Sequence, residues 1–234
     1  MEATPAPIVK ASTSSMEPGI TDILIRGRQT ILDILEDRGY DVTNYRNIAP
    51  DQILALAESG GARTPLDIIV KKTPDSLAPC ERAVVVYQIS DRAIRGRLGT
   101  TFLRDLYDVD VGGITVTKKD DLIVLINEPY NEAFDKVAIQ MWQTEKIRLT
   151  FFHIKQVVVH PGRHVLVPPH RKLTSDETKE ALGMLRVKEK TQLPLIKHHD
   201  IQSRVMGLVP GDVVEILRPS PTAGVARFLR ICSA

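Results

Sequence analysis

The chain has 234 residues, of which 43% are hydrophobic, and its formal net charge is +2. This length allows one large domain or two ordinary ones, at about 100–150 residues per domain. The two cysteines, Cys80 and Cys232, are too few for a disulfide framework and lack the paired spacing of a zinc site. Because the chain also has no apolar run of about 18 residues and no signal-peptide pattern at its start, we expect a soluble protein of a reducing, intracellular compartment.

The charge is divided unevenly along the chain. Up to Ile154 there are 18 basic and 22 acidic residues, and from Lys155 onward 13 basic and 7 acidic residues, together with five of the six histidines. A positive C-terminal part favours an acidic partner or a phosphate backbone. A solvated surface explains the same excess equally well, so both interpretations stay open.

The N-terminal part begins with residues 1–18, which are rich in Ala, Thr, Pro and Ser and are expected to be a disordered tail. A helix is predicted from Gly19, with Gly39 as its C-terminal stop. A shorter helix follows Pro50 and ends before Gly60. The first helix should be amphipathic, with a buried stripe of Ile20, Leu24, Ile31, Ile34 and Leu35.

Short apolar runs bounded by charge or proline then alternate with helical patterns. Such runs are typical of strands covered on both faces. One helix is expected from Ser90, burying Ile94, Leu98, Phe102 and Leu106, and another from Asn131, burying Phe134, Val137, Ala138 and Met141. The predicted strands cover residues 66–70, 83–89, 122–126 and 148–154. We therefore expect an α/β N-terminal domain.

The last seventy residues contain ordered elements but no catalytic pattern. A strand is expected over 164–168, ending at a proline, and the capping box Thr174–Glu177 predicts a helix start. In that helix Ala181, Leu182 and Leu185 should form the apolar stripe, and the following cations should lie at its negative pole: Arg186, Lys188 and Lys190. Pro194 ends the helical pattern, and Gly207–Gly211 predicts a turn between strands. With strands at 213–217 and 226–231, this is a small mixed α+β sheet braced by one helix.

This order of elements resembles the C-terminal domain of the fifth-largest subunit of nuclear RNA polymerases, shared by polymerases I, II and III, and of the archaeal H subunit. The chain departs from the family pattern at Ile201, Pro221, Val225 and Ala226, which puts local contacts in question. The matching residues are His164, Leu166 to Pro168, His170, Leu173, Ser175 to Glu177, Gln192 to Pro194, Gly207, Leu208, Gly211, Val213, Val214, Ile216, Arg218, Ser220 and Thr222 to Gly224.

The element order of the N-terminal half also matches the eukaryotic family, with short similarities such as Asp37–Tyr40. In that family this domain resembles a restriction-endonuclease fold stripped of its catalytic groups. A nuclease would need acidic residues for magnesium and a nearby lysine, but Asp67 is followed by no acidic-x-Lys pair on the next strand. We therefore predict no catalytic residue, metal or cofactor. A metal at His198–Asp200 is disfavoured because adjacent histidines in a strand point to opposite faces.

Four arginines in the predicted helix after Ser90 form a candidate DNA-proximal cluster, because their spacing would let them touch a phosphate backbone. An exposed helix face opposite the apolar stripe explains them more simply. The cluster comprises Arg92, Arg95, Arg97 and Arg104.

The resemblance implies a non-catalytic structural subunit of DNA-directed RNA polymerase in the nucleus, or in a virion or infected cell if the source is viral. Its domains would be 19–155, a jaw near downstream DNA and regulators, and 156–234, which docks on the largest subunit. The alternatives are a free-standing DNA-binding or adaptor protein and a residual nuclease. The expected docking residues are His164, His170, Arg218, Ser220, Thr222 and Gly224.

Overall fold

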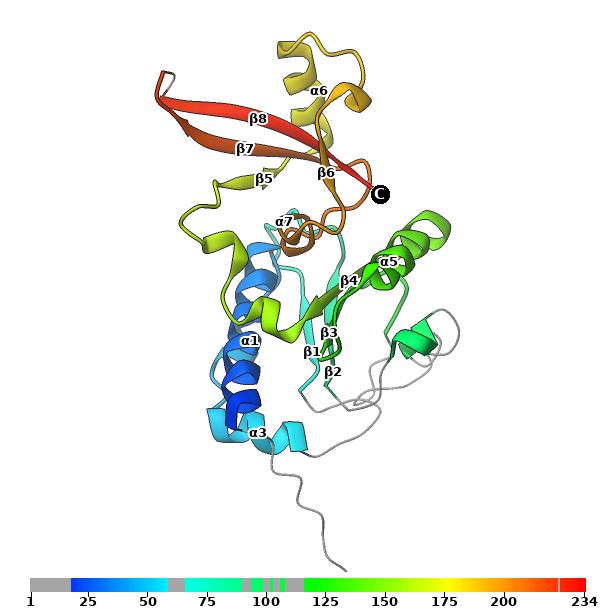
Figure 1. Cartoon of the computed structure of the whole chain (residues 1–234). Helices are drawn as coiled ribbons and strands as arrows, with labels where there is room; N and C mark the ends of the chain where they lie inside the picture. Colours follow the sequence, from blue (N-terminus) through cyan, green and yellow to red (C-terminus); the bar gives the residue numbers. More distant parts are fainter. Residues whose placement is uncertain are drawn as a thin grey trace, which may run out of the picture.

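The computed structural model describes residues 18–58, 66–89, 94–98, 102, 106–107, 116–222 and 224–234. It contains two four-stranded sheets, one in each half of the chain, stacked along the long direction of the molecule (Figure 1). None of its described helices is long and apolar enough to cross a membrane. Residues 1–17 of the predicted tail, the Ser90 cap, Arg92 and Arg104 lie outside the described residues.

The N-terminal sheet has the strand order β1-β2-β3-β4. β2, β3 and β4 are parallel, and β1 is antiparallel to β2 at the edge. All six residues of β3 are buried, as its continuous apolar sequence predicts for a central strand. The strands are β1 (Ile68–Lys71), β2 (Arg82–Gln88), β3 (Asp121–Ile126) and β4 (Arg148–His153).

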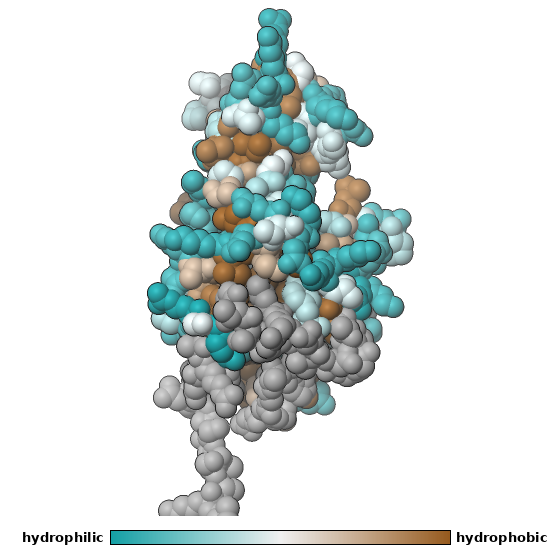
Figure 2. Space-filling model, turned by 90° about the vertical axis from the view of Figure 1, so that its right-hand side faces the viewer, coloured by the Kyte–Doolittle hydropathy of each residue, from teal (hydrophilic) through white to brown (hydrophobic). Residues whose placement is uncertain are grey.

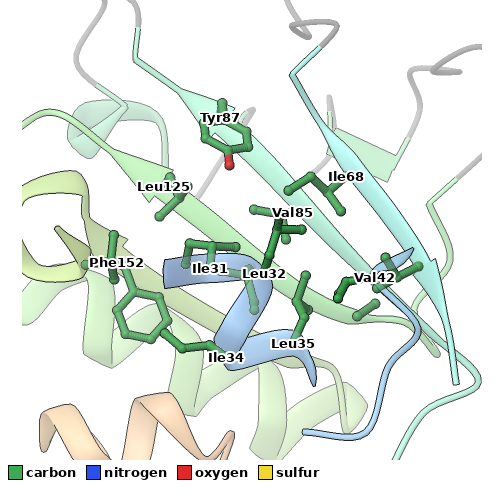
Figure 3. Packing of buried hydrophobic residues seen from close by; sticks show 14 of the residues in the cluster. Ile31, Leu32, Ile34, Leu35, Val42, Ile68, Val85, Tyr87, Leu125 and Phe152 are labelled. Carbon is green, nitrogen blue, oxygen red and sulfur yellow. The ribbon is translucent and has the colours of Figure 1, made fainter. Parts of the chain in front are cut away.

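Helices cover both faces of this sheet. α1 (Pro18–Asp37) lies on one face, with α2 (Thr43–Arg46) and α3 (Pro50–Glu58) beside it, and α5 (Glu132–Glu145) lies on the other. Figure 3 shows the α1 side chains packed against alternate residues of the strands, including Val85 and Leu125. The residues between them face the opposite core under α5, because successive strand side chains alternate.

The four predicted strands and the helices after Gly19, Pro50 and Asn131 are confirmed to within a few residues. Gly39 ends the first helix with φ +93°, and the Asn131 side chain accepts a hydrogen bond from the Ala133 backbone. The short helix α2 was not predicted. In the region after Ser90, the four predicted apolar side chains are buried. The described residues there are helical at the 3-10 turn η1 (Arg95–Arg97), at Leu98, at Phe102 and at Leu106 and Tyr107, and the rest of the predicted helix lies outside the described residues.

The C-terminal sheet has the order β5-β7-β8-β6 and is mixed, as predicted. β7 is antiparallel to both β5 and β8, whereas β6 runs parallel to β8. β7 and β8 form a long hairpin that extends away from the rest of the molecule (Figure 1). The strands are β5 (His170–Lys172), β6 (Leu195–Lys197), β7 (Val213–Ser220) and β8 (Gly224–Ser233).

Two helices accompany this sheet, one on each face. α6 (Ser175–Met184) packs over Val213 and Leu229. On the other face, α7 (Ile201–Val205) is followed directly by Met206 and Leu208, which pack with Val214. The capping box is confirmed: the Thr174 hydroxyl accepts from the Glu177 backbone, and the Glu177 carboxylate accepts from Thr174. β6 and α7 were not predicted.

The prediction for the end of α6 was wrong. The helix stops at Met184, and Arg186 takes a left-handed conformation with φ +52°. The backbone N–H groups of Arg186 and Val187 bond to the carbonyls of Gly183 and Leu182, which closes the helix and leaves Lys188 and Lys190 beyond it. Leu185, expected in the apolar stripe, is exposed.

The predicted strand over 164–168 was also wrong. This segment is a turn that follows the 3-10 helix η4 (Pro161–Arg163), and the Val167 backbone donates to the His164 carbonyl at 2.8 Å. Pro168 and Pro169 lack the N–H groups that a strand ladder needs. Pairing therefore begins only at His170. The histidines at 198 and 199 lie in a turn rather than a strand, with His198 buried and His199 exposed.

Candidate subunit-docking interface

Most of the predicted docking residues share one face of the C-terminal sheet. Directly paired residues of antiparallel strands lie on the same face. The pairs His170–Ile216, Arg218–Ala226 and Ser220–Gly224 are spaced two residues apart along β7, so they line up on that face. We call this surface the hairpin face; it consists of His170, Ile216, Arg218, Ser220, Gly224, Ala226, Phe228 and Arg230.

The hairpin face is basic and partly apolar. The Arg218 guanidinium lies 5.2 Å from the centroid of the Phe228 ring, and 46% of Phe228 is exposed. An arginine stacked on an exposed aromatic ring offers a partner both charge and apolar surface. Arg230 adds a second cation and donates to the Leu195 carbonyl at 2.8 Å. Such a surface suits an acidic partner that also buries apolar side chains.

The tip of the hairpin contains Ser220 and Gly224 of the hairpin face and one further residue of the predicted set, Thr222. Gly224 has φ +68°, a conformation that strongly favours glycine. The hydroxyls of Ser220 and Thr222 lie 3.4 Å apart across the turn. These three residues therefore set the conformation of the hairpin tip within the chain itself.

His164 lies apart from the hairpin face, on the turn before β5. Its Nδ1 accepts a hydrogen bond from the Leu166 backbone at 3.2 Å, whereas His170 Nδ1 lies 2.6 Å from the Pro168 carbonyl oxygen. The two histidines thus bracket the turn and hold it in shape. Between them Val165 and Leu166 are 91% and 83% exposed. They are candidate contact residues that were not singled out from the sequence, because a strand was expected there.

The C-terminal part of the chain is tied to the N-terminal half through Arg38. Its Nη1 lies 2.9 Å from Asp121 Oδ2, and both side chains are at most 4% exposed. The same guanidinium donates to the carbonyls of Val205, at 3.0 Å, and Arg204. These carbonyls belong to the last turn of α7, where a cation is favoured, and the Arg204 carbonyl also accepts from the Gly207 backbone N–H at 3.1 Å. The similarity at Asp37–Tyr40 therefore falls where the two halves meet.

Two more arginines cross the junction. Arg148 of β4 donates to the Gly207 carbonyl at 2.9 Å. In the opposite direction, Arg204 of α7 donates to the Phe151 carbonyl at 3.0 Å and lies 4.4 Å from the Tyr130 ring centroid. Arg38, Arg148 and Arg204 together form what we call the arginine clasp. Because these guanidinium groups bond backbone atoms, the clasp fixes the position of α7 on the N-terminal sheet.

A cleft of about 820 Å³ lies beside the clasp, between the two halves. Its wall includes Arg38, Leu77, His160, His170 and Met206. Burial lowers the pKa of His160, which lies 3.3 Å from Asp37. Figure 2 shows another face of the molecule, where apolar surface over the C-terminal half is broken up by hydrophilic side chains. The cleft and the hairpin face meet at His170.

The described residues contain no group of three or more His, Cys, Asp or Glu side chains arranged to hold a metal. The two adjacent carboxylates at the start of β3 are instead paired with arginines: Asp120 with Arg82, at 2.7 Å, and Asp121 with Arg38. Burial raises the pKa of Cys80 to about 11 and that of Cys232 to about 12, so both thiols stay protonated near neutral pH.

The candidate DNA-proximal cluster is only half described. Arg95 and Arg97 are exposed in η1, and the backbone N–H groups of Ile94 and Arg95 donate to the Glu128 carboxylate at 2.8 and 3.3 Å. Glu128 follows β3 in the chain, so it anchors the turn to the sheet. Arg95 and Arg97 are exposed, whereas Ile94 and Leu98 on either side of them are buried.

Residues 159–232 match the family model described as RNA polymerase Rpb5, C-terminal domain. Rpo5, a subunit of DNA-directed RNA polymerase in Pyrococcus abyssi, is 46% identical over 69 residues, which cover 30% of this chain and 83% of the relative. The chain belongs to the Rpb5 family of RNA polymerase subunits. All the predicted docking residues lie within the matched segment, whereas the four arginines lie outside it.

Relatives of similar length extend the Rpb5 similarity to most of the chain. The subunit rpabc1 of RNA polymerases I, II and III from Dictyostelium discoideum is 29% identical over 209 residues, which cover 89% of this chain and 96% of the relative. RPABC1 from Caenorhabditis elegans is 26% identical over 207 residues, which cover 86% and 91%. The N-terminal half is therefore part of the similarity.

Proposed function

We propose that this chain is a non-catalytic structural subunit of a nuclear DNA-directed RNA polymerase and takes part in DNA-templated transcription. The observation that carries the proposal is that five of the six predicted docking residues lie on the hairpin face or at its tip, within the segment matched by the Rpb5 model.

In this proposal the two halves have different partners. Residues 156–234 form the docking domain, and the hairpin face with the Val165–Leu166 turn contacts the largest polymerase subunit. Residues 19–155 form a jaw domain, an endonuclease-like fold without catalytic groups, which extends toward downstream DNA and toward regulators. The arginine clasp supports separate roles for the two domains, because it holds the jaw domain at a fixed position relative to the docking domain.

The docking proposal is tested by purifying tagged variants from the native cell and measuring the recovered polymerase. Arg218→Glu places an anion on the hairpin face without removing a buried group, and we expect recovery of the largest subunit to fall about tenfold. The matched control is Lys136→Glu on α5, whose side chain is 77% exposed and lies outside 159–232. If Arg218→Glu, His170→Ala and Leu166→Asp all retained the polymerase as the control does, the docking assignment would be wrong.

The jaw proposal is tested separately with assembled polymerase. Arg95→Glu combined with Arg97→Glu should reduce crosslinking of this subunit to downstream DNA while leaving its co-purification unchanged, since a phosphate contact depends on charge. Unchanged crosslinking in the double variant would assign these arginines to a solvated surface. Binding of the purified chain to DNA without polymerase subunits would favour the adaptor alternative, and magnesium-dependent cleavage would favour the nuclease.

A further inference from the structure

The two outer edges of the C-terminal hairpin differ in their capacity to accept another strand. On β7 the N–H of Leu217 donates to the Pro169 carbonyl, and the Val213 carbonyl accepts from Leu173. The backbone N–H and carbonyl groups of the odd-numbered β7 residues are therefore directed toward β5. β5 ends there, and the next odd-numbered residue of β7 is Pro219. Because proline has no N–H, this edge is blocked to further pairing.

In the described part of the chain, the outer edge of β8 has no strand partner beyond the end of β6, although the Leu229 residue there is buried in a cluster that includes Leu193. The backbone N–H and carbonyl groups of the odd-numbered β8 residues are directed toward β6, since the Ile231 N–H donates to the Pro194 carbonyl. β6 pairs only with Ile231–Ser233. Among the described residues, no strand pairs with the edge formed by Val225, Arg227 and Leu229, three positions two residues apart, each with an N–H and a carbonyl directed outward. Natural sheets normally shorten, bend or block such an edge.

The side chains along this edge indicate what would pair with it. Val225 and Phe228 are 62% and 46% exposed, and Arg227 is 43% exposed at its side chain. Val225 and Arg227 lie on one face of the hairpin, and Phe228 lies on the other face together with Arg218 and Arg230. Glu215, the one acidic residue in the sequences of β7 and β8, already bonds Arg171 and Arg227. An added strand would therefore meet apolar and cationic side chains on both faces.

We propose that β8 receives an extended segment of a neighbouring polymerase subunit as a fifth strand of the C-terminal sheet. This inference rests on the proposed function as a polymerase subunit. The backbone groups of Val225, Arg227 and Leu229 supply the hydrogen bonds, and alternate side chains supply specificity. The segment is recognised by apolar residues placed against Val225 and Phe228 and by acidic residues placed against the arginines. The exposed Val225, where the chain departs from its family, lies at the outer end of this strand.

Hydrogen exchange resolved at single amides tests the proposal. In the isolated full chain the odd-numbered amides at 225, 227 and 229 should exchange fast, whereas the even-numbered amides at 226, 228 and 230 are protected by pairing with β7. In purified polymerase the three odd-numbered amides should slow by at least about 100-fold. Equal exchange of these amides in the free and assembled chain would overturn the proposal, and failure of the chain to enter polymerase would instead refute the proposed function.

A pair of substitutions at one position isolates the backbone contribution. Arg227→Ala and Arg227→Pro both remove the side chain and its ion pair with Glu215, but only proline removes the outward N–H. We expect Arg227→Pro to bind polymerase about tenfold more weakly than Arg227→Ala, since the partner's carbonyl is left without a donor. Equal recovery of the two folded variants would refute strand addition. If Arg227→Pro does not fold, as judged by circular dichroism, the exchange experiment decides.

A second copy of this chain is the competing occupant of the edge. Sedimentation of the isolated full chain distinguishes it, because pairing between two β8 edges would give a dimer with slow exchange at 225, 227 and 229. A monomer with fast exchange at these amides supports a partner from the polymerase. A dimer with protected odd-numbered amides would overturn it.

Discussion

Replacing Arg38 with methionine tests whether the arginine clasp holds the two halves together. Methionine keeps most of the side-chain stem but removes the bonds to Asp121 and to two carbonyls of α7. Since the Arg38 and Asp121 side chains are 4% and 3% exposed, the substitution leaves a buried carboxylate without its partner. Breaking a buried pair in this way costs about 3–5 kcal/mol. For a chain of this size that corresponds to a fall in Tm of roughly 6–20 °C.

The assay is thermal and urea unfolding of the isolated full chain, with Arg163→Met as the matched control. Arg163 also bonds across the junction, to Asp33 at 2.7 Å and Asp37 at 3.4 Å, but its side chain is 53% exposed. Such a pair contributes about 0–1 kcal/mol. Adding Asp121→Asn to Arg38→Met removes the stranded charge and should recover part of the loss. If Arg38→Met unfolded within about 1 kcal/mol of Arg163→Met, the proposed burial and role of the clasp would be wrong.

Three further predictions concern the glycines and the helix cap. Gly207→Ala should destabilise the chain by about 1–2 kcal/mol in urea unfolding, because φ is +61° there and an added Cβ would lie 2.9 Å from a guanidinium carbon of the clasp. Gly183→Ala should stabilise it by roughly 0.5–1 kcal/mol, since that helical glycine has open space around it and alanine forms helix better; a loss of stability would contradict this reasoning. Hydrogen bonds from the Thr174 backbone and from Arg171 lower the pKa of Glu177 from 4.5 to about 2, so its contribution to α6 is present above about pH 4.5 and lost as the pH falls toward 2. Arg171→Met should raise that pKa in an NMR titration, and an unchanged value would exclude the ion pair.

Local signals in the sequence are sufficient to predict most of the secondary structure. The buried runs of β2 and β3, the Thr174 cap and the glycines at 39, 207 and 211 act within a few residues of themselves, so their structural consequences are predictable. The signals failed where local preference was weak. Val165 and Leu166 have strand-like side chains, but the prolines after them and the backbone bond to His164 make a turn.

Two sheets, a basic C-terminal half and the residues that mark the Rpb5 family can all be read from the amino-acid sequence. That His170, Arg218 and Ser220 share one face became visible only in the folded chain, because it depends on the register of strands β5, β7 and β8, which come from separate segments of the sequence. The tertiary structure also decided the destination of Arg38, whose bonds to α7 span 166 and 167 residues. Side-chain pairing at such separations is set by how the chain packs, and no local pattern encodes it. The open edge of β8 follows from the same cause, since an unpaired strand edge exists only once every other strand has taken its place.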